Sequence, residues 1–269
     1  MKKVLTPRWI VGHLIALALV GLFVSLGFWQ LRRLHQREAY NVFLGARLTA
    51  EPQPFAQLLE RFSLDAPVDA EDSAFYRRAR VTGSFDAENE ILLRSRAFNG
   101  QPGYHVLTPL QLGSGRALLV DRGWVPFELD TPPIPQAAPP AAPLTLTGIL
   151  QPVQRPLEGG LMNRLGLVQR DPAEGKLEAV FYVDPSRIER QLPYRLEPVF
   201  LELQSQSPAQ PGRLPVPPEA PDLTQGSHLS YALQWFSFAL IGIIGYVTLM
   251  RSVVREKPKT VKRGRLGNA

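Results

Sequence analysis

Cysteine is absent from the 269 residues of this chain. The chain can therefore form no disulfide, and it offers neither a thiol nucleophile nor a thiolate metal site. Several enzyme signatures are absent as well: the Gly-x-Ser-x-Gly turn, the phosphate-binding loop, the His-Glu-x-x-His pair and the dinucleotide-binding glycine pattern. We expect a protein that is not an enzyme.

Charged residues are missing from two long apolar stretches, residues 10–28 and 229–250. Each stretch is long enough to cross a hydrocarbon core of ~30 Å as a helix. The expected fold is a membrane protein in which two transmembrane α-helices flank a β-rich, barrel- or sandwich-like (α+β) extracytoplasmic domain. The boundaries that we predict are a cytoplasmic N-terminus, a first span, the domain, a second span and a basic cytoplasmic tail, at residues 1–8, 9–31, 32–227, 228–250 and 251–269.

Basic residues set the expected orientation. Seven lysines and arginines follow Met250 against one acidic residue, which predicts a cytoplasmic C-terminus. With two spans the N-terminus lies on the same side, as Lys2, Lys3 and Arg8 also indicate, although the arginines after the first stretch oppose it. We expect the tail to contact the lipid bilayer rather than nucleic acid.

The end of the first stretch lacks a small-x-small cleavage site, which predicts an uncleaved anchor. No Arg- and Ser-rich transit peptide precedes it, so we expect a multi-pass protein of the bacterial plasma (inner) membrane.

The middle of the chain changes from helical spacing to period two. Helical spacing predicts that the first helix continues through residues 31–48 and that short helices cover 55–62 and 186–192. Alternation predicts strands at 79–85, 90–96, 104–112, 117–124, 144–151, 179–184 and 199–203. Of two proline-rich stretches, 131–143 is expected to connect strands and 208–221 to be a stiff tether to the second span. Asp86, Glu88 and Glu90 are expected to form a solvated acidic turn.

Four sequence strings are unusual in combination. In chain order they are Gly-Phe-Trp-Gln-Leu-Arg-Arg-Leu at 27–34, Gly-Tyr-His-Val-Leu-Thr-Pro-Leu at 103–110, Leu-Val-Asp-Arg-Gly-Trp-Val-Pro at 119–126 and His-Leu-Ser-Tyr-Ala-Leu-Gln-Trp-Phe at 228–236. Together with the two apolar stretches, this set resembles the surfeit locus protein 1 family of cytochrome c oxidase assembly factors. The resemblance covers nearly the whole chain. Asp121 is a mild departure, because the family often has Asn there.

The resemblance implies a non-catalytic role in maturing the haem-copper oxidase. Bacterial members of the family are reported to bind haem a and are thought to deliver it to the large oxidase subunit; a haem a synthase is a second candidate partner. The proposed haem ligand in the family is the histidine that opens the second span, which is His228 here.

The spacing of the residues that follow His228 also makes this histidine a candidate ligand, independently of the resemblance. His228, Tyr231, Ala232 and Trp235 lie at i, i+3, i+4 and i+7, so they share one helix face that offers an imidazole, room for close approach and aromatic surface for a porphyrin. The plainer interpretation is an interfacial histidine or helix cap within a membrane aromatic belt, to which Trp29 would also belong.

Arginines lie near the same depth. A guanidinium can hold a haem propionate, which makes Arg32 and Arg33 candidate cofactor-binding residues, although contact with lipid phosphate explains them equally well. For Arg122 we favour a structural role, with a buried carboxylate, a propionate or a partner protein as its counterpart. His105 is expected to be a surface or satisfied core residue and is the next candidate ligand; His13 lies at the opposite end of the first span.

Three functional readings follow. In the first, the chain carries haem a to the oxidase, with His228 as iron ligand. In the second, it is a scaffold that stabilises an oxidase assembly intermediate and binds no haem. The third, a membrane-tethered enzyme, requires a cleft with clustered His, Asp or Glu residues.

Overall fold

The computed structural model describes residues 6–156, 159, 164–172 and 175–255. Most of the basic tail that sets the expected orientation, residues 256–269, lies outside this part of the chain. The chain divides into two compact units. One contains the residues up to Val42 and from Leu223 onward, and the other contains Phe43–Asp222.

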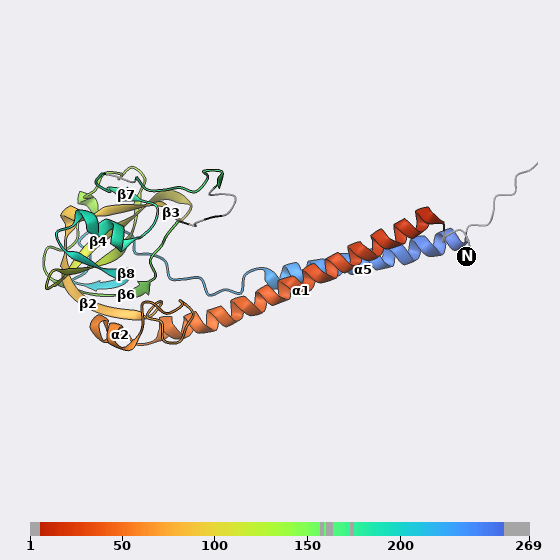
Figure 1. Ribbon diagram of the computed structural model, residues 1–269, viewed down its shortest axis with the longest axis horizontal. Coiled ribbons are helices and arrows are strands. Elements are labelled where there is room, and N and C mark those ends of the chain that lie inside the picture. The colour runs from red at the N-terminus through yellow and green to blue at the C-terminus, as the bar shows by residue number, and fades with distance from the viewer. Residues whose placement is uncertain (1–5, 157–158, 160–163, 173–174, 256–269) are drawn as a thin grey trace, which may run out of the picture. The chain divides into compact units, whose positions relative to one another are not determined.

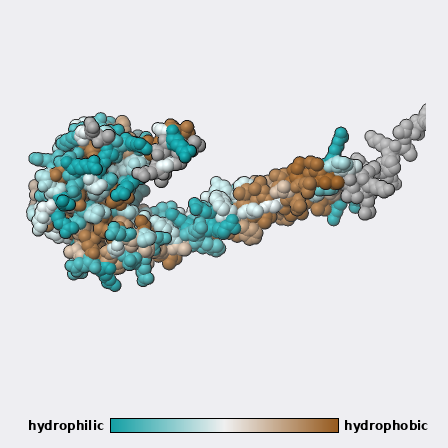
Figure 2. Space-filling model, in the orientation of Figure 1, coloured by the Kyte–Doolittle hydropathy of each residue, from teal (hydrophilic) through white to brown (hydrophobic). Residues whose placement is uncertain are grey.

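The first unit contains two long helices: α1 (Pro7–Thr49), up to Val42, and α5 (His228–Arg255). Both are long and apolar enough to cross a membrane, and their apolar side chains are largely exposed, as the brown surface over these helices in Figure 2 shows. Exposed apolar surface of this extent is typical of a contact with a membrane or with another protein. The prediction that the first helix continues through residues 31–48 is confirmed.

The second unit is a sheet-rich domain with short helices around it, as expected (Figure 1). The strands are β1 (Gln53–Pro54), β2 (Arg78–Phe85), β3 (Ile91–Phe98), β4 (Gln101–Gly113), β5 (Arg116–Pro126), β6 (Leu144–Gln151), β7 (Ala179–Val180) and β8 (Arg195–Ser207). The helices and 3-10 turns are α2 (Phe55–Arg61), η2 (Ala87–Asn89), η3 (Pro135–Ala137), α4 (Pro185–Ile188) and η4 (Glu189–Gln191).

The sheet has the order β1-β2-β6-β8-β5-β4-β3-β7. β5 and β8 are parallel, whereas β2–β6, β6–β8, β5–β4 and β4–β3 are antiparallel. β2 also pairs with β4 at Ser84–Gln111 and Phe85–Leu110, so the sheet curls back on itself. The hairpin predicted between 104–112 and 117–124 is confirmed as β4 and β5.

Both faces of the curled sheet are covered. Along β5, Leu118 and Val120 pack into one core cluster while Leu119 packs into another. The same alternation occurs on β8, where Leu201 joins the first cluster and Phe200 the second. Side chains that alternate between two cores fix the register of a strand, because a slip by one residue would exchange every partner.

Two expectations for the strands and connections of the domain are wrong. The strand expected at 179–184 is only the two-residue β7: Val183, beyond its end, is buried in a core cluster, but its carbonyl accepts from the Gln154 N–H at 2.9 Å outside the sheet. The stretch 208–221 is not simply a tether: Val216 exchanges backbone hydrogen bonds with Trp124 of β5, at 2.7 and 2.8 Å, and Leu214 packs against a buried cluster. We call residues 208–217 the strap.

Candidate functional site

α1 and α5 lie side by side and antiparallel (Figure 1). Near the start of α1, His13 Nδ1 contacts the hydroxyl of Tyr246. Further along, the ring of Phe23 stacks on that of Trp235, with centroids 5.8 Å apart and an interplanar angle of 23°. The contacts therefore run in opposite directions along the two helices, and the register of the pair is defined by side chains.

Gly27 allows a close approach between these helices. A Cβ atom there would lie 2.4 Å from Cε1 of the Phe236 ring, a distance that real Cβ atoms do not adopt. The same ring packs edge-on against Phe28, with centroids 5.4 Å apart. Gly21, by contrast, has no heavy atom within 4 Å of its ideal Cβ position. Only the first of these two glycines is needed for helix packing.

His228 lies just beyond this contact, as the first residue of α5. Its Nδ1 is 3.0 Å from Oε1 of Gln30 on α1. Gln30 follows Phe23 and Gly27 at helical spacing, so all three face α5. Both members of the pair lie directly outside the uncharged stretches, at the end of the apolar section of each helix.

The segment that precedes His228 is held on α1 through its own backbone carbonyl groups. Asn41 Nδ2 donates to the carbonyl oxygens of Leu223 and Thr224, at 2.6 and 3.0 Å. Arg37 Nε donates to the Thr224 carbonyl at 3.2 Å. Gly226 then turns with φ +67°, a conformation that favours glycine. These contacts fix the backbone one turn before His228.

The two aromatic residues predicted beside His228 differ in their surroundings. Tyr231 is 50% exposed. Trp235 is partly buried, because it stacks on Phe23 and also meets Phe238 edge-on at 5.9 Å. Ala232 is fully buried. Tyr231 thus offers open aromatic surface, whereas Trp235 serves the contact between the helices; their role toward a porphyrin stays a prediction.

Trp29, Arg32 and Arg33 are all exposed on α1. At 100° per residue, Arg33 lies three positions after Gln30 and shares its side of the helix. Arg32 lies two positions after Gln30 and leaves α1 on nearly the opposite side. The backbone therefore groups Arg33, rather than Arg32, with the His228–Gln30 pair.

The remaining histidines have partners of their own. His13 meets Tyr246, His35 lies 3.3 Å from Glu38 on the surface of α1, and His105 Nδ1 lies 2.9 Å from Asp121 Oδ2 in the sheet domain. His105 is thus a satisfied, largely buried residue, as predicted. Within the described part of the chain, no three His, Asp or Glu side chains are arranged to hold a metal ion.

In the sheet domain, Arg122 is wholly buried and pairs with a buried carboxylate, one of the counterparts considered for it. Its Nη1 lies 3.3 Å from Glu90 Oε2, and its Nη2 donates to Ala137 O at 2.6 Å and to Gln210 Oε1 at 3.0 Å. Burial lowers the pKa of Arg122 to about 10 although the Glu90 charge opposes this, and burial raises the pKa of Glu90. The expectation that Glu90 lies in a solvated turn is wrong.

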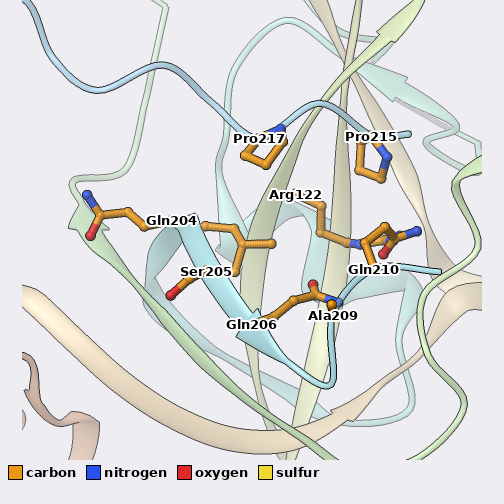
Figure 3. A pocket seen from close by; sticks show the side chains of 9 residues that line it. Arg122, Gln204, Ser205, Gln206, Ala209, Gln210, Pro215 and Pro217 are labelled. Carbon is orange, nitrogen blue, oxygen red and sulfur yellow. The ribbon is translucent and has the colours of Figure 1, made fainter. Parts of the chain in front are cut away.

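Arg122 also borders a hollow of about 190 Å³ between the end of β8 and the strap (Figure 3). Its other lining residues are Leu203, Gln204, Ser205, Gln206, Ala209, Gln210, Pro215 and Pro217. The Arg122 guanidinium beside this hollow makes its hydrogen bonds to residues of the sheet domain. This lining lacks the clustered His, Asp or Glu side chains that the tethered-enzyme reading requires.

A second polar cluster lies where β4, β5 and β8 adjoin. Asp121 and Glu202 are register partners on the parallel strands β5 and β8, and His105 bonds to Asp121. Burial, and then the charge of Asp121, raises the pKa of Glu202 to about 7, while His105 and Arg96 act in the opposite direction. Gln151 donates to Glu202 at 3.0 Å.

Gln30 lies in the string at residues 27–34, but no role was predicted for it. The signal that could have found it is the 23, 27, 30 spacing, which places an amide on the helix face that carries the Gly27 contact. The burial of Glu90 had no comparable signal, because it depends on residues 32 and 44 positions away.

The fold and this site define a class: a sheet-rich domain between two apolar helices, with an imidazole where those helices end their apolar pairing. The model of the SURF1 family matches residues 17–240. The chain belongs to the SURF1 family.

Individual relatives agree with the family assignment. A SURF1-like protein of Mycobacterium tuberculosis is 28% identical over 245 residues, covering 90% of this chain and 83% of the relative. A SURF1-like protein of Rickettsia felis is 25% identical over 245 residues, covering 90% and 98%. The cytochrome oxidase assembly protein SHY1 of Saccharomyces cerevisiae is 32% identical over 124 residues, covering 46% of this chain and 30% of SHY1.

Proposed function

We propose that this chain is a membrane-bound assembly factor of the haem-copper cytochrome c oxidase that holds haem a and delivers it to the large oxidase subunit. An oxidase assembly role is supported by family membership and by the similarity to SHY1, which bears that function in its name. α1 and α5 cross the bacterial plasma membrane, and the sheet domain lies outside the cytoplasm. The exposed apolar surface of both helices supports this placement.

The observation that carries the haem proposal is the position of the His228 imidazole. It is held against α1 through Nδ1 at the point where both helices end their apolar section. Among the described residues, no polar atom bonds to its Nε2. Imidazole is the common axial ligand of haem iron, and a ring placed there has apolar helix surface on one side and water on the other.

The surrounding residues suit an amphipathic porphyrin. Tyr231 presents half of its surface beside His228, which can cover part of the macrocycle. Arg33, on the Gln30 side of α1, is placed to pair with a propionate. A single axial ligand from the protein suits a carrier, because the cargo must leave.

The proposal is tested with the full chain, purified in detergent from cells that make haem a. Its optical and pyridine-haemochrome spectra are compared with those of His228→Ala, and of His35→Ala as a matched control on the exposed surface of α1. Haem a present in wild type and in His35→Ala but lost in His228→Ala supports the carrier. Haem retained by His228→Ala contradicts the assignment of the ligand, and a wild-type chain without haem favours the scaffold.

A further inference from the structure

The His228–Gln30 contact has a defined direction. The atom of Gln30 that faces Nδ1 of His228 is Oε1, at 3.0 Å. An amide oxygen only accepts hydrogen bonds, so this arrangement assigns the proton to Nδ1. A neutral imidazole protonated at Nδ1 has its lone pair on Nε2. Iron can bind only the nitrogen that holds the lone pair.

We infer that Gln30 is a positioning residue, which fixes His228 in the Nδ1–H tautomer and thereby presents Nε2 as the ligating atom. This inference rests on the proposed function for its consequence, but the tautomer itself is a property of the chain alone. A metal-ligating histidine usually donates its other ring N–H to an acceptor that fixes the tautomer and the orientation of the ring. Gln30 fills that position.

The helix contact holds the acceptor in place. Gln30 is one turn after Gly27, where the Phe236 ring of α5 leaves no room for a Cβ atom. Gln30 can therefore reach His228 across a gap that the Gly27–Phe236 contact keeps small. An acceptor on a rigid helix fixes a ring more closely than one on a loop.

The opposite edge of the ring is kept open by Gly226. A Cβ atom at this position would lie 3.9 Å from His228 Nε2 and 3.8 Å from Cδ2. A larger side chain would extend into the space beside Nε2. A porphyrin whose iron is bound by Nε2 would lie at this edge of the imidazole, and a residue without a side chain would permit its approach.

The first test needs no haem. Full-length chain labelled with ¹⁵N-histidine is placed in lipid nanodiscs, and the His228 nitrogens are assigned by subtraction of the His228→Ala spectrum. We expect Nδ1 in the protonated range and Nε2 in the unprotonated range. Gln30→Leu removes the acceptor and should shift the population toward Nε2–H, whereas Gln36→Leu, an exposed glutamine on the same helix, should leave it unchanged.

Haem binding provides the second readout. Gln30→Leu should weaken haem a affinity about 10- to 100-fold, as expected for loss of an outer hydrogen-bond partner. Gln30→Glu, which accepts more strongly, should retain the haem and lower its midpoint potential. Gly226→Leu should weaken binding more than Gly226→Ala, which shares the strain of a side chain at φ +67°, and neither variant should change the tautomer.

The outcomes separate the two proposals. A wild-type His228 with its proton on Nε2, or a tautomer population that Gln30→Leu does not change, overturns the role of Gln30 whether or not haem is bound. A tautomer that depends on Gln30 in a chain whose haem content does not depend on His228 overturns the proposed function alone.

Discussion

The guanidinium of Arg122 and the carboxylate of Glu90 form an ion pair with side chains 0% and 1% exposed, 32 positions apart in the sequence. Arg122 stands on β5, and Glu90 immediately precedes β3. Glu90 Oε1 also accepts from the backbone N–H of Ile134 at 2.8 Å. The pair thus joins two strands to the proline-rich connection between β5 and β6.

Removing either partner should destabilise the domain strongly. Arg122→Ala or Glu90→Ala leaves one buried charge without its counterpart, which typically costs about 3–5 kcal/mol. Urea unfolding of the full chain in mild detergent, followed by circular dichroism of the sheet, measures this loss. Arg80→Ala is the control: this arginine lies on β2 with an exposed side chain, so we expect a loss of at most about 0.5 kcal/mol. Equal losses in the two arginine variants would contradict this account.

Gly123 should tolerate no side chain. Its φ is +115°, and a Cβ would lie 1.9 Å from the carbonyl oxygen of Val216 in the strap. Gly123→Ala should therefore release the strap from β5 and increase the rate at which trypsin cleaves after Arg213, an exposed strap residue, as followed by mass spectrometry.

The control for backbone strain is Gly115→Ala. Gly115 also has a positive φ, +70°, but its Cβ position is open, so this variant should lose only about 1–2 kcal/mol and leave the strap attached. Cleavage after Arg213 that is equally fast in wild type and in Gly123→Ala would show that this contact does not hold the strap.

Local pattern predicted much of this fold. The strand at residues 144–151 and the β4–β5 hairpin follow from alternation and a glycine-containing loop, both of which are local signals. The resemblance and helical spacing also brought His228 forward. What they could not supply was its partner, because Gln30 lies 198 positions away and meets it only once two helices pack.

Two of the three expectations that failed did so for a shared reason. Glu90 and residues 208–217 have polar or proline-rich composition, which is typical of solvated segments. Their burial depends on partners distant in the sequence, Arg122 for Glu90 and Trp124 for Val216. Composition indicates the free-energy cost of burying a polar group. Only the fold shows which contacts compensate for that cost.

The stability of the domain should decrease as pH rises from about 4.5 to 7. The pKa of Glu202 is raised to about 7 in the fold, so the folded chain binds a proton there that the unfolded chain has released. The stability that the protonated Glu202 contributes is fully present below about pH 4.5 and is lost above about pH 7. At pH 8, Glu202→Gln should unfold at a higher urea concentration than wild type, with a free energy of unfolding about 1–2 kcal/mol larger. Near pH 5 the two chains should have the same free energy of unfolding. A difference that does not change with pH would contradict the role of this carboxyl.

Bulk at Gly27 should separate the helices and disturb His228. Gly27→Leu meets the Phe236 ring, whereas Gly21→Leu enters open space and serves as the control. The chain has no native cysteine, so a Val20→Cys, Gly242→Cys pair reports on helix contact; the ideal Cβ of Gly242 lies 3.8 Å from Val20 Cγ2. In that background, disulfide formation in membranes should fall in Gly27→Leu and persist in Gly21→Leu. Haem content should fall with it, because the His228–Gln30 distance depends on the same contact. If cross-linking falls while haem is retained, the ligand does not depend on the helix pair, and Gln30 cannot be what holds it.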